Sequence, residues 1–431
     1  MWFKGTKRPT STAEATSELD CQVDLHGLMD SVTEQKITSL DLWQRLDQYK
    51  ASRETGSEAA LATSLLEDVD LLLLFQAIDW AYRVGDENKS KLSGDALIRL
   101  LRSTVGAEIL MERPEVLSFL LAGLVHQVVG VRRLTINAVR ALGMGKEEGK
   151  ENRCREFVDP PLLPAIVLLL GDEDVGVAQV AGATVVDLCK CGATERNSGF
   201  SVVLTTLERH MGEVTAGLTC RQAATPRLRF ADTTARVAAL SDAAFMAARD
   251  TGALSLVLSV AEDKDDILLR LNGLELLEQV AATRTGGRYL LAHGHLEALL
   301  VAAGAVGEEP PDPLLGPSAL RVLAAVHAKT ASMGAEAWAE VDPSLARAFL
   351  RACLIHMEAL DETGKVAALV AASTMAGSSE ASLKAVLEEG NGQSDLLDAW
   401  MTLSRHKASA SQHCSHASLR FAFSIAFFCL I

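Results

Sequence analysis

Aromatic residues are scarce in this chain of 431 residues, where they make up only 5% of the sequence. Runs in which apolar and polar residues alternate, the pattern of a strand with one buried face, are hard to find. Apolar residues nevertheless reach 48%, and alanine and leucine, both strong helix formers, dominate them. This composition favours an all-helical protein.

Positive charge is also in short supply. The chain has 41 Lys and Arg against 56 Asp and Glu, which gives a formal net charge of −15. Binding of nucleic acid as a main role needs a basic face that neutralises phosphates. We therefore expect no nucleic-acid partner.

Long hydrophobic runs are absent as well. The most apolar segment, Leu419–Ile431, has 13 residues and includes Arg420, whereas a bilayer span needs about 20. The segment Met1–Pro9 is basic but no apolar run follows it, so no secretory signal is visible. We expect no membrane partner and a cytoplasmic protein, with the nucleus as a further compartment.

The eight cysteines include no Cys-x-x-Cys pair, which argues against a structural zinc site. We interpret them as reduced, mostly buried thiols in a reducing compartment. His413, Cys414 and His416 stand close together, but they lie in a Ser/Ala-rich tail with no second cysteine nearby. We read that grouping as a coincidence and expect no metal site.

Catalytic motifs are missing too. The segment Gly143–Lys150 resembles a phosphate loop, but five residues separate Gly143 from the Gly149-Lys150 pair where the motif requires four, and Glu151 follows in place of Ser or Thr. Neither a His-Glu-x-x-His motif nor a nucleophile elbow occurs. The sequence predicts a protein that is not an enzyme, with no cofactor and no small-molecule substrate.

A recurring phrase is what the chain does contain. A glycine followed by a short apolar helix start appears at Gly252–Leu258 and again at Gly294–Leu300, 42 residues later. A fixed period of about 40–47 residues is typical of armadillo and HEAT repeats. Such arrays generally function as binding surfaces.

A second phrase supports this period. The segment Val131–Leu142 aligns with Val177–Leu188 at an offset of 46, and both carry an apolar face at helical spacing. A third copy begins at Ile267, and the helix expected at Leu228–Leu240 fills the place between them. We predict an all-α, right-handed superhelical solenoid of armadillo/HEAT-like repeats, in which Leu134 and Val185 are buried.

The chain divides into three parts by composition. We expect a disordered leader at 1–20, the helical repeat array at 21–407 and an irregular apolar tail at 408–431. Similar acidic turns, Gly171–Asp174 and Glu262–Asp266, precede two of the repeated helices. The segment Met211–Pro226 looks like an inserted loop, because Gly199 and Gly252 lie 53 residues apart.

Two groups of polar residues are candidates for a protein interface, because each lies on one face of a repeated helix. The alternative for each residue is an ordinary solvated surface. The candidates are Arg133, Asn137 and Arg140 in the first copy, and Asn272, Glu275 and Gln279 in the third.

The segments Arg270–Ala281 and Gly287–Gly294 resemble a stretch of the 26S proteasome non-ATPase regulatory subunit 5 family. The resemblance lies in the helix, in the Gly-Arg-Tyr-Leu-Leu sequence that follows it and in the glycine that opens the next helix. It covers about Leu25 to Leu403, and the chain departs from the family at its end.

This resemblance implies an assembly chaperone of the proteasome regulatory particle base. Members of the family bind the C-terminal domain of an ATPase subunit through an arc of helical repeats. A generic armadillo scaffold or adaptor for another complex is the alternative. The regularly spaced Trp and Asn residues of importin-type adaptors are absent.

Overall fold

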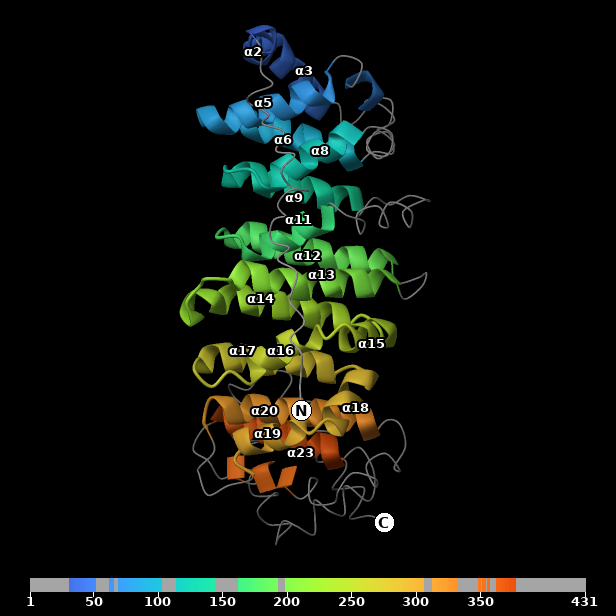
Figure 1. Cartoon of the computed structure of the whole chain (residues 1–431), viewed down its shortest axis with the longest axis vertical. Coiled ribbons are helices and arrows are strands. Elements are labelled where there is room, and N and C mark those ends of the chain that lie inside the picture. Colours follow the sequence, from blue (N-terminus) through green and yellow to red (C-terminus); the bar gives the residue numbers. More distant parts are fainter. Residues whose placement is uncertain are drawn as a thin grey trace, which may run out of the picture. The chain divides into compact units, whose positions relative to one another are not determined.

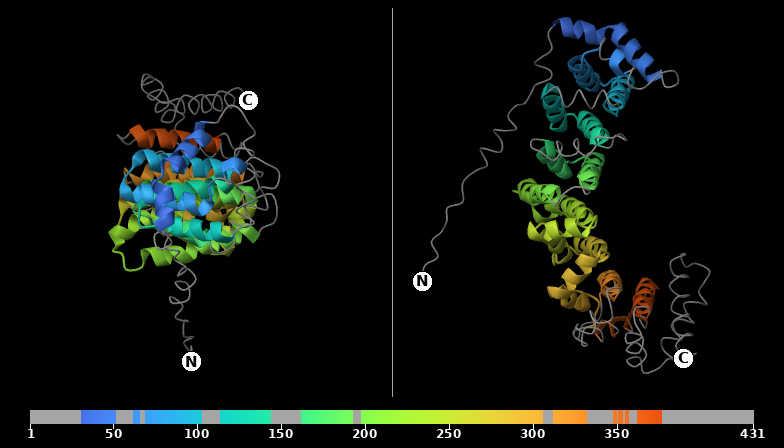
Figure 2. Two further views of the ribbon diagram at one scale, coloured as in Figure 1. Left: turned by 90° about the horizontal axis from the view of Figure 1, so that it is seen from above. Right: turned by 90° about the vertical axis from the view of Figure 1, so that its right-hand side faces the viewer.

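The computed structural model describes residues 31–51, 62–65, 69–102, 114–143, 162–192, 198–305, 312–331, 348–349, 351–353, 355–356 and 362–376. Within these ranges the chain forms helices and the turns that connect them, with no strand (Figure 1). The chain divides into two compact units, Met1–Gly217 and Leu218–Ile431. Each unit consists of helices in successive layers (Figure 2).

Residues 62–65 of the first unit are helical. Among its described residues the unit also contains nine longer α-helices and one short 3-10 helix. They are α2 (Ser31–Thr38), α3 (Leu40–Ala51), α5 (Leu71–Val84), α6 (Glu87–Arg102), α8 (Pro114–Leu124), α9 (Val129–Gly143), α11 (Leu162–Leu168), η1 (Leu169–Gly171), α12 (Val175–Gly192) and α13 (Ser198–Thr215).

Residues 348–349, 351–353 and 355–356 of the second unit are helical. The described part of this unit also contains eight longer α-helices. They are α14 (Cys220–Ala238), α15 (Asp242–Asp250), α16 (Leu254–Ala261), α17 (Ile267–Ala281), α18 (Arg284–Ala292), α19 (His295–Ala302), α20 (Leu315–Ala331) and α23 (Glu362–Ala376).

The helices repeat in a fixed order that is clearest in the second unit. Two short helices precede a long one in α15–α16–α17 and again in α18–α19–α20. We call the long helices α9, α12, α14, α17 and α20 the third helices. Within the first unit α9 packs on α12, and within the second α17 packs on both α14 and α20.

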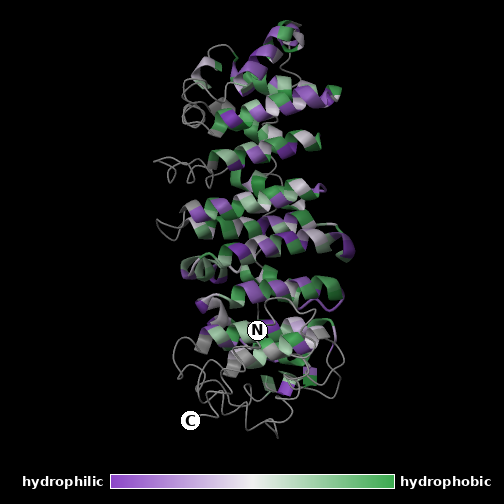
Figure 3. Ribbon diagram, turned by 180° about the vertical axis from the view of Figure 1, so that it is seen from behind, coloured by the Kyte–Doolittle hydropathy of each residue, from purple (hydrophilic) through white to green (hydrophobic). Residues whose placement is uncertain are grey.

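The spacing of the third helices confirms the predicted fold class. Helices α9 and α12 begin 46 residues apart, and α14, α17 and α20 begin 47 and 48 residues apart. Leu134 of α9 and Val185 of α12 are buried, as the repeated apolar face predicts. The chain is an all-α repeat solenoid of armadillo/HEAT-like units. Its helices carry both hydrophobic and hydrophilic residues (Figure 3), and the apolar ones form the buried core.

The glycine of the recurring phrase has a backbone role. Gly252 and Gly294 have φ values of 81° and 77°, so both lie in the left-handed region that glycine adopts without strain. Each ends the turn that leads into a short second helix, α16 or α19. The phrase therefore marks the corner between the first two helices of a repeat.

The predicted inserted loop at Met211–Pro226 is wrong. Helix α13 continues to Thr215 and α14 begins at Cys220, so only residues 216–219 connect them. Thr219 opens α14 with a capping box, in which its hydroxyl accepts from the backbone N–H of Gln222 and the Gln222 side chain accepts from the Thr219 N–H. Pro226 lies inside α14 with its ring buried, where it removes one backbone donor without ending the helix.

Several predictions lie outside the described residues. These are the leader at 1–20, the tail at 408–431, and the grouping of His413, Cys414 and His416. In the described part no single helix has the length and apolar character to cross a membrane. One bent pair, α15 with α16 at 80°, meets that test by length and composition.

Candidate interaction surface on the third helices

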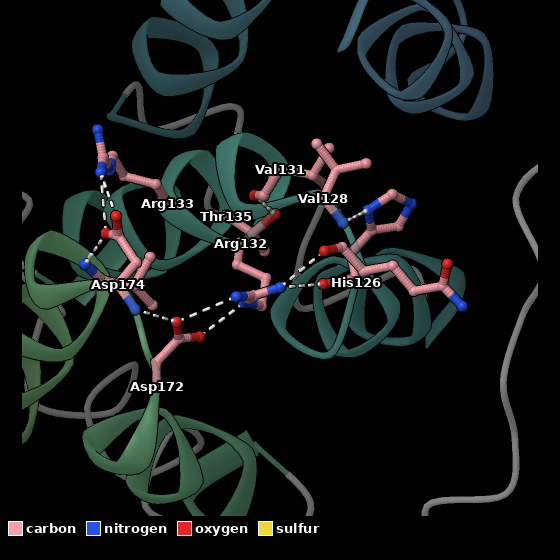
Figure 4. Close-up of polar contacts among 10 residues, drawn as sticks. His126, Val128, Val131, Arg132, Arg133, Thr135, Asp172 and Asp174 are labelled. Atoms are coloured by element: carbon pink, nitrogen blue, oxygen red, sulfur yellow. Dashed lines mark hydrogen bonds and ion pairs between the residues drawn. The ribbon is translucent and has the colours of Figure 1, made fainter. Parts of the chain in front are cut away.

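The candidate residues of α9 share one face, and two of them contact the next repeat. Arg133 donates from Nη2 to both carboxylate oxygens of Asp174, at 2.7 and 2.8 Å (Figure 4). Asp174 also accepts from the backbone N–H of Val177 at 2.8 Å and so caps α12. The Arg133 side chain is still 54% exposed. This side chain therefore joins two repeats and faces solvent at once.

Arg140 makes a similar contact about two helical turns further along α9. Its guanidinium lies 2.8 Å from Oδ2 of Asp187 on α12, and Lys190 approaches the other oxygen at 3.4 Å. Asn137, which lies between the two arginines, donates from Nδ2 to the backbone oxygen of Arg133 at 2.7 Å. The face predicted as an interface thus carries two ion pairs that connect α9 to the next repeat.

A more buried arginine stands beside this face. Arg132 donates from Nε and Nη2 to the two oxygens of Asp172, at 2.6 and 3.0 Å. Its Nη1 donates to the backbone oxygens of His126 and Gln127, which lie in the turn between α8 and α9 (Figure 4). The side chains of Arg132 and Asp172 are 16% and 5% exposed, and the hydrogen bond to Asp172 raises the pKa of Arg132. We call this arrangement the arginine clasp.

The arginine clasp recurs in the second unit. Arg227 of α14 donates to Oδ2 of Asp263 at 2.8 Å and to the backbone oxygen of Ser259 at 3.2 Å. Burial would raise the pKa of Asp263, but the bonds from Arg227 and from the N–H groups of Asp265 and Asp266 lower it below its usual value. The two acidic turns are therefore the acceptors of equivalent clasps.

Both acidic turns are visible in the sequence, but their arginine partners were not predicted. The sequence contains a pattern that could have predicted them. Each clasp joins an arginine to an aspartate about one repeat later, at separations of 40 and 36 residues. Asp187, the partner of Arg140, was missed for a different reason. It lies in the middle of a helix and follows no turn motif.

The candidate residues of α17 belong to the second unit, and one of them, Glu275, contacts α20. Glu275 lies 3.8 Å from Arg321, which also donates to Glu278 at 3.2 Å. Asn272 donates to the backbone oxygen of Leu268 at 2.7 Å, and Gln279 is exposed. The residues predicted in α17 thus share one helix surface, and Arg321 was the partner that periodicity did not reveal.

The described residues hold no group of three or more His, Cys, Asp and Glu side chains that could bind a metal ion. The thiols of Cys189 and Cys353 are buried. Burial raises the pKa of Cys189 to about 12 and that of Cys353 further still, so both thiols stay protonated at neutral pH. They pack as small apolar side chains, not as nucleophiles.

Comparison with known proteins finds no related family, but it finds solved structures that are distantly similar to this chain. No family model matches the chain, and no curated protein matches it. An engineered protein of known structure has 18% identity and a TM-score of 0.42, over 61% of this chain and 98% of its own.

Two designed armadillo repeat proteins are also similar, each over 61% of this chain and 99% of their own. One is in complex with the peptide (KR)4, at 14% identity and a TM-score of 0.41. The other was designed for modular peptide recognition, at 16% identity and a TM-score of 0.39. At these values the fold assignment depends on the helices of this chain itself.

Proposed function

We propose that this chain is a scaffold without catalytic activity that binds another protein through its third helices. The observation that carries the proposal is that each unit presents charged side chains on its third helices. Arg133 and Arg140 on one unit, and Glu275 and Arg321 on the other, are fixed by ion pairs and remain partly exposed. Charged groups held in place in this way favour orientation-specific association.

The partner that we propose is an ATPase subunit of the proteasome base, in the cytoplasm or nucleus. Support for this finer assignment comes from the sequence resemblance at Arg270–Ala281 and Gly287–Gly294. Those residues pack the fold: Gly273 of α17 lies against the backbone of Ala261, and Tyr289 lies edge-on to Phe245 at 5.7 Å. The resemblance therefore supports the shape of the repeat more directly than the choice of partner. A scaffold for another complex fits the same surface.

The test is a pull-down with purified base ATPase subunits on the full chain. The exposed candidate Gln279 is not part of an inter-repeat ion pair, so Gln279→Arg changes the surface and leaves the packing intact. Arg133→Gln removes a half-exposed charge, and its melting temperature is recorded alongside binding. We expect weaker retention for both variants at an unchanged melting temperature. No retention of any ATPase subunit by the wild-type chain would eliminate the proteasome partner and leave the general scaffold.

A further inference from the structure

Three large aliphatic side chains are exposed where two adjacent third helices begin. Ile267 and Leu268 open α17 and are 43% and 65% exposed, and Leu314 directly precedes α20 and is 54% exposed. Helices α17 and α20 pack against each other. We call these three residues the aliphatic edge. A side chain that stays in water when the chain folds contributes little to stability, so folding alone does not account for the edge.

The position of the aliphatic edge recurs in the repeat. Ile267 lies two residues before the buried Leu269, just as Val129 and Val175 in the first unit lie two residues before the buried Val131 and Val177. Val129 and Val175 are likewise exposed. Single exposed apolar residues are ordinary, but here the exposed residue recurs at the same place in α9 and α12 of the first unit and in α17 of the second. In the second unit, three exposed apolar residues lie at the starts of only two helices, α17 and α20.

Acidic residues surround the aliphatic edge. Glu262 and Asp265 are exposed in the turn before α17. Asp266 and Asp312 cap α17 and α20, where they accept from the backbone N–H groups of Leu269 and Leu315. With Asp263, these are five carboxylates against three cations, which are Arg227, Lys264 and Arg270. The surroundings of the edge are therefore negative.

We propose that the aliphatic edge binds a basic amphipathic helix of a partner protein. Charge complementarity selects a basic partner, and a second copy of this chain, with its net charge of −15, is repelled. The spacing selects a helix. Packed helices lie about 8–10 Å apart, and apolar residues seven positions apart on a helix are separated by about 10.5 Å along its axis. One such residue then meets α17 and the next meets α20.

This inference deepens the proposed function, because it names a partner class and a second surface for the same scaffold. It is tested with a labelled synthetic peptide, helical and rich in lysine, with leucine at every seventh position and one turn away. A peptide of the same composition with its leucines distributed around the helix is the first control. A peptide with glutamate in place of lysine is the second. Binding to the full chain is measured by fluorescence anisotropy.

The decisive protein variant is the triple change Ile267→Gln, Leu268→Gln and Leu314→Gln. Its matched control is Val301→Gln, because Val301 is 56% exposed on α19 but lies off the edge. For charge, Asp265→Asn is compared with Glu297→Gln. We expect the triple variant to weaken binding of the patterned peptide at least about tenfold, Asp265→Asn to weaken it less, and both controls to leave it unchanged.

Equal binding of the two lysine peptides, or a triple variant that binds like the wild type, would overturn the inference. Sedimentation of the wild-type chain shows whether a second copy occupies the edge, and self-association abolished by the triple variant would also overturn it. The ATPase pull-down is read separately. If the wild-type chain retains the ATPase but does not bind the patterned lysine peptide, the aliphatic edge is wrong and the proposed function stands.

Discussion

At the scale of single residues, two adjacent arginines on α9 have different roles. Arg132 is nearly buried against Asp172, whereas Arg133 is half exposed beside Asp174. An exposed ion pair contributes about 0–1 kcal/mol. Removal of one partner from a buried pair costs more, because the other charge stays buried without compensation.

This difference gives a prediction with an internal control. We expect Arg132→Leu to lower the free energy of unfolding by about 3–5 kcal/mol, since it removes the guanidinium that pairs with the nearly buried Asp172 carboxylate and that donates to two backbone oxygens. Arg133→Leu should lower it by less than about 1 kcal/mol. Urea unfolding followed by circular dichroism measures both. Similar losses for the two variants would show that the clasp does not hold the repeats together.

Asp79 is a second buried, paired carboxylate, and its contribution to stability depends on pH. Its buried carboxylate accepts two bonds from Arg83, at 2.8 and 3.0 Å, and lies 2.9 Å from Nε2 of His126. Burial would raise the pKa of Asp79, but the bonds from His126 and Arg83 outweigh it and lower the pKa. Such a group stabilises the fold fully above its unfolded pKa of about 3.9 and loses this contribution as pH falls through the lower folded value.

We therefore expect Asp79→Asn to be less stable than the wild type at neutral pH and to lose less stability on acidification. Urea midpoints measured from about pH 5 down to about pH 2.5 would show the two curves converging. Asp250→Asn is the control, because Asp250 is an exposed partner of Arg249. Parallel curves for Asp79→Asn and the wild type would contradict the assignment.

At the scale of helices, periodicity in the sequence predicted what neighbouring repeats share. The faces of α9, α12 and α17 were predicted because burial of an apolar stripe follows directly from the 3.6-residue period. The connection of α13 to α14 was not predicted, because the capping box at Thr219 and the tolerated Pro226 are local details that a spacing argument overlooks. Periodicity placed Arg140 and Glu275 on polar faces, but their partners Asp187 and Arg321 depend on how neighbouring helices pack.

Glycine in helices gives a prediction at this scale. A Cβ at Gly273 would lie 2.4 Å from the backbone nitrogen of Ala261, so α17 and α16 are packed as closely as only glycine permits. We expect Gly273→Ala to destabilise the second unit, although alanine favours a helix by about 1 kcal/mol over glycine. The control is Gly212→Ala in α13, where nothing lies within 4 Å of the added carbon. Gly212→Ala should raise the thermal midpoint, and Gly273→Ala should lower it.

At the scale of the whole molecule, a repeat array is held together by contacts between neighbouring elements. This is why the fold was predictable from the sequence: each repeat needs only to match the next. The binding partner could not be predicted in the same way, because the packing of one repeat on the next does not specify what binds to the surface. The aliphatic edge illustrates this, because Leu268 and Leu314 break the pattern of buried apolar residues and so carry information that packing does not require.

Because contacts join neighbouring helices only, a destabilising substitution should affect the helices that pack next to it. Leu134 of α9 is buried against Gly94 of α6, and α9 also packs on α8 and α12. Leu134→Asp places an unpaired charge in that contact, so we expect amide protection to fall in α6, α8, α9 and α12. Protection in α17 and α20 should be kept, since neither helix contacts α9 closely.

Leu277→Asp is the reciprocal variant in α17, and it should expose α14, α16, α17 and α20 while leaving α6 and α9 protected. Hydrogen exchange followed by mass spectrometry resolves the two patterns segment by segment. Uniform loss of protection along the chain for both variants would mean that the two units unfold as one cooperative block. The additive, nearest-neighbour description of this array would then be incorrect.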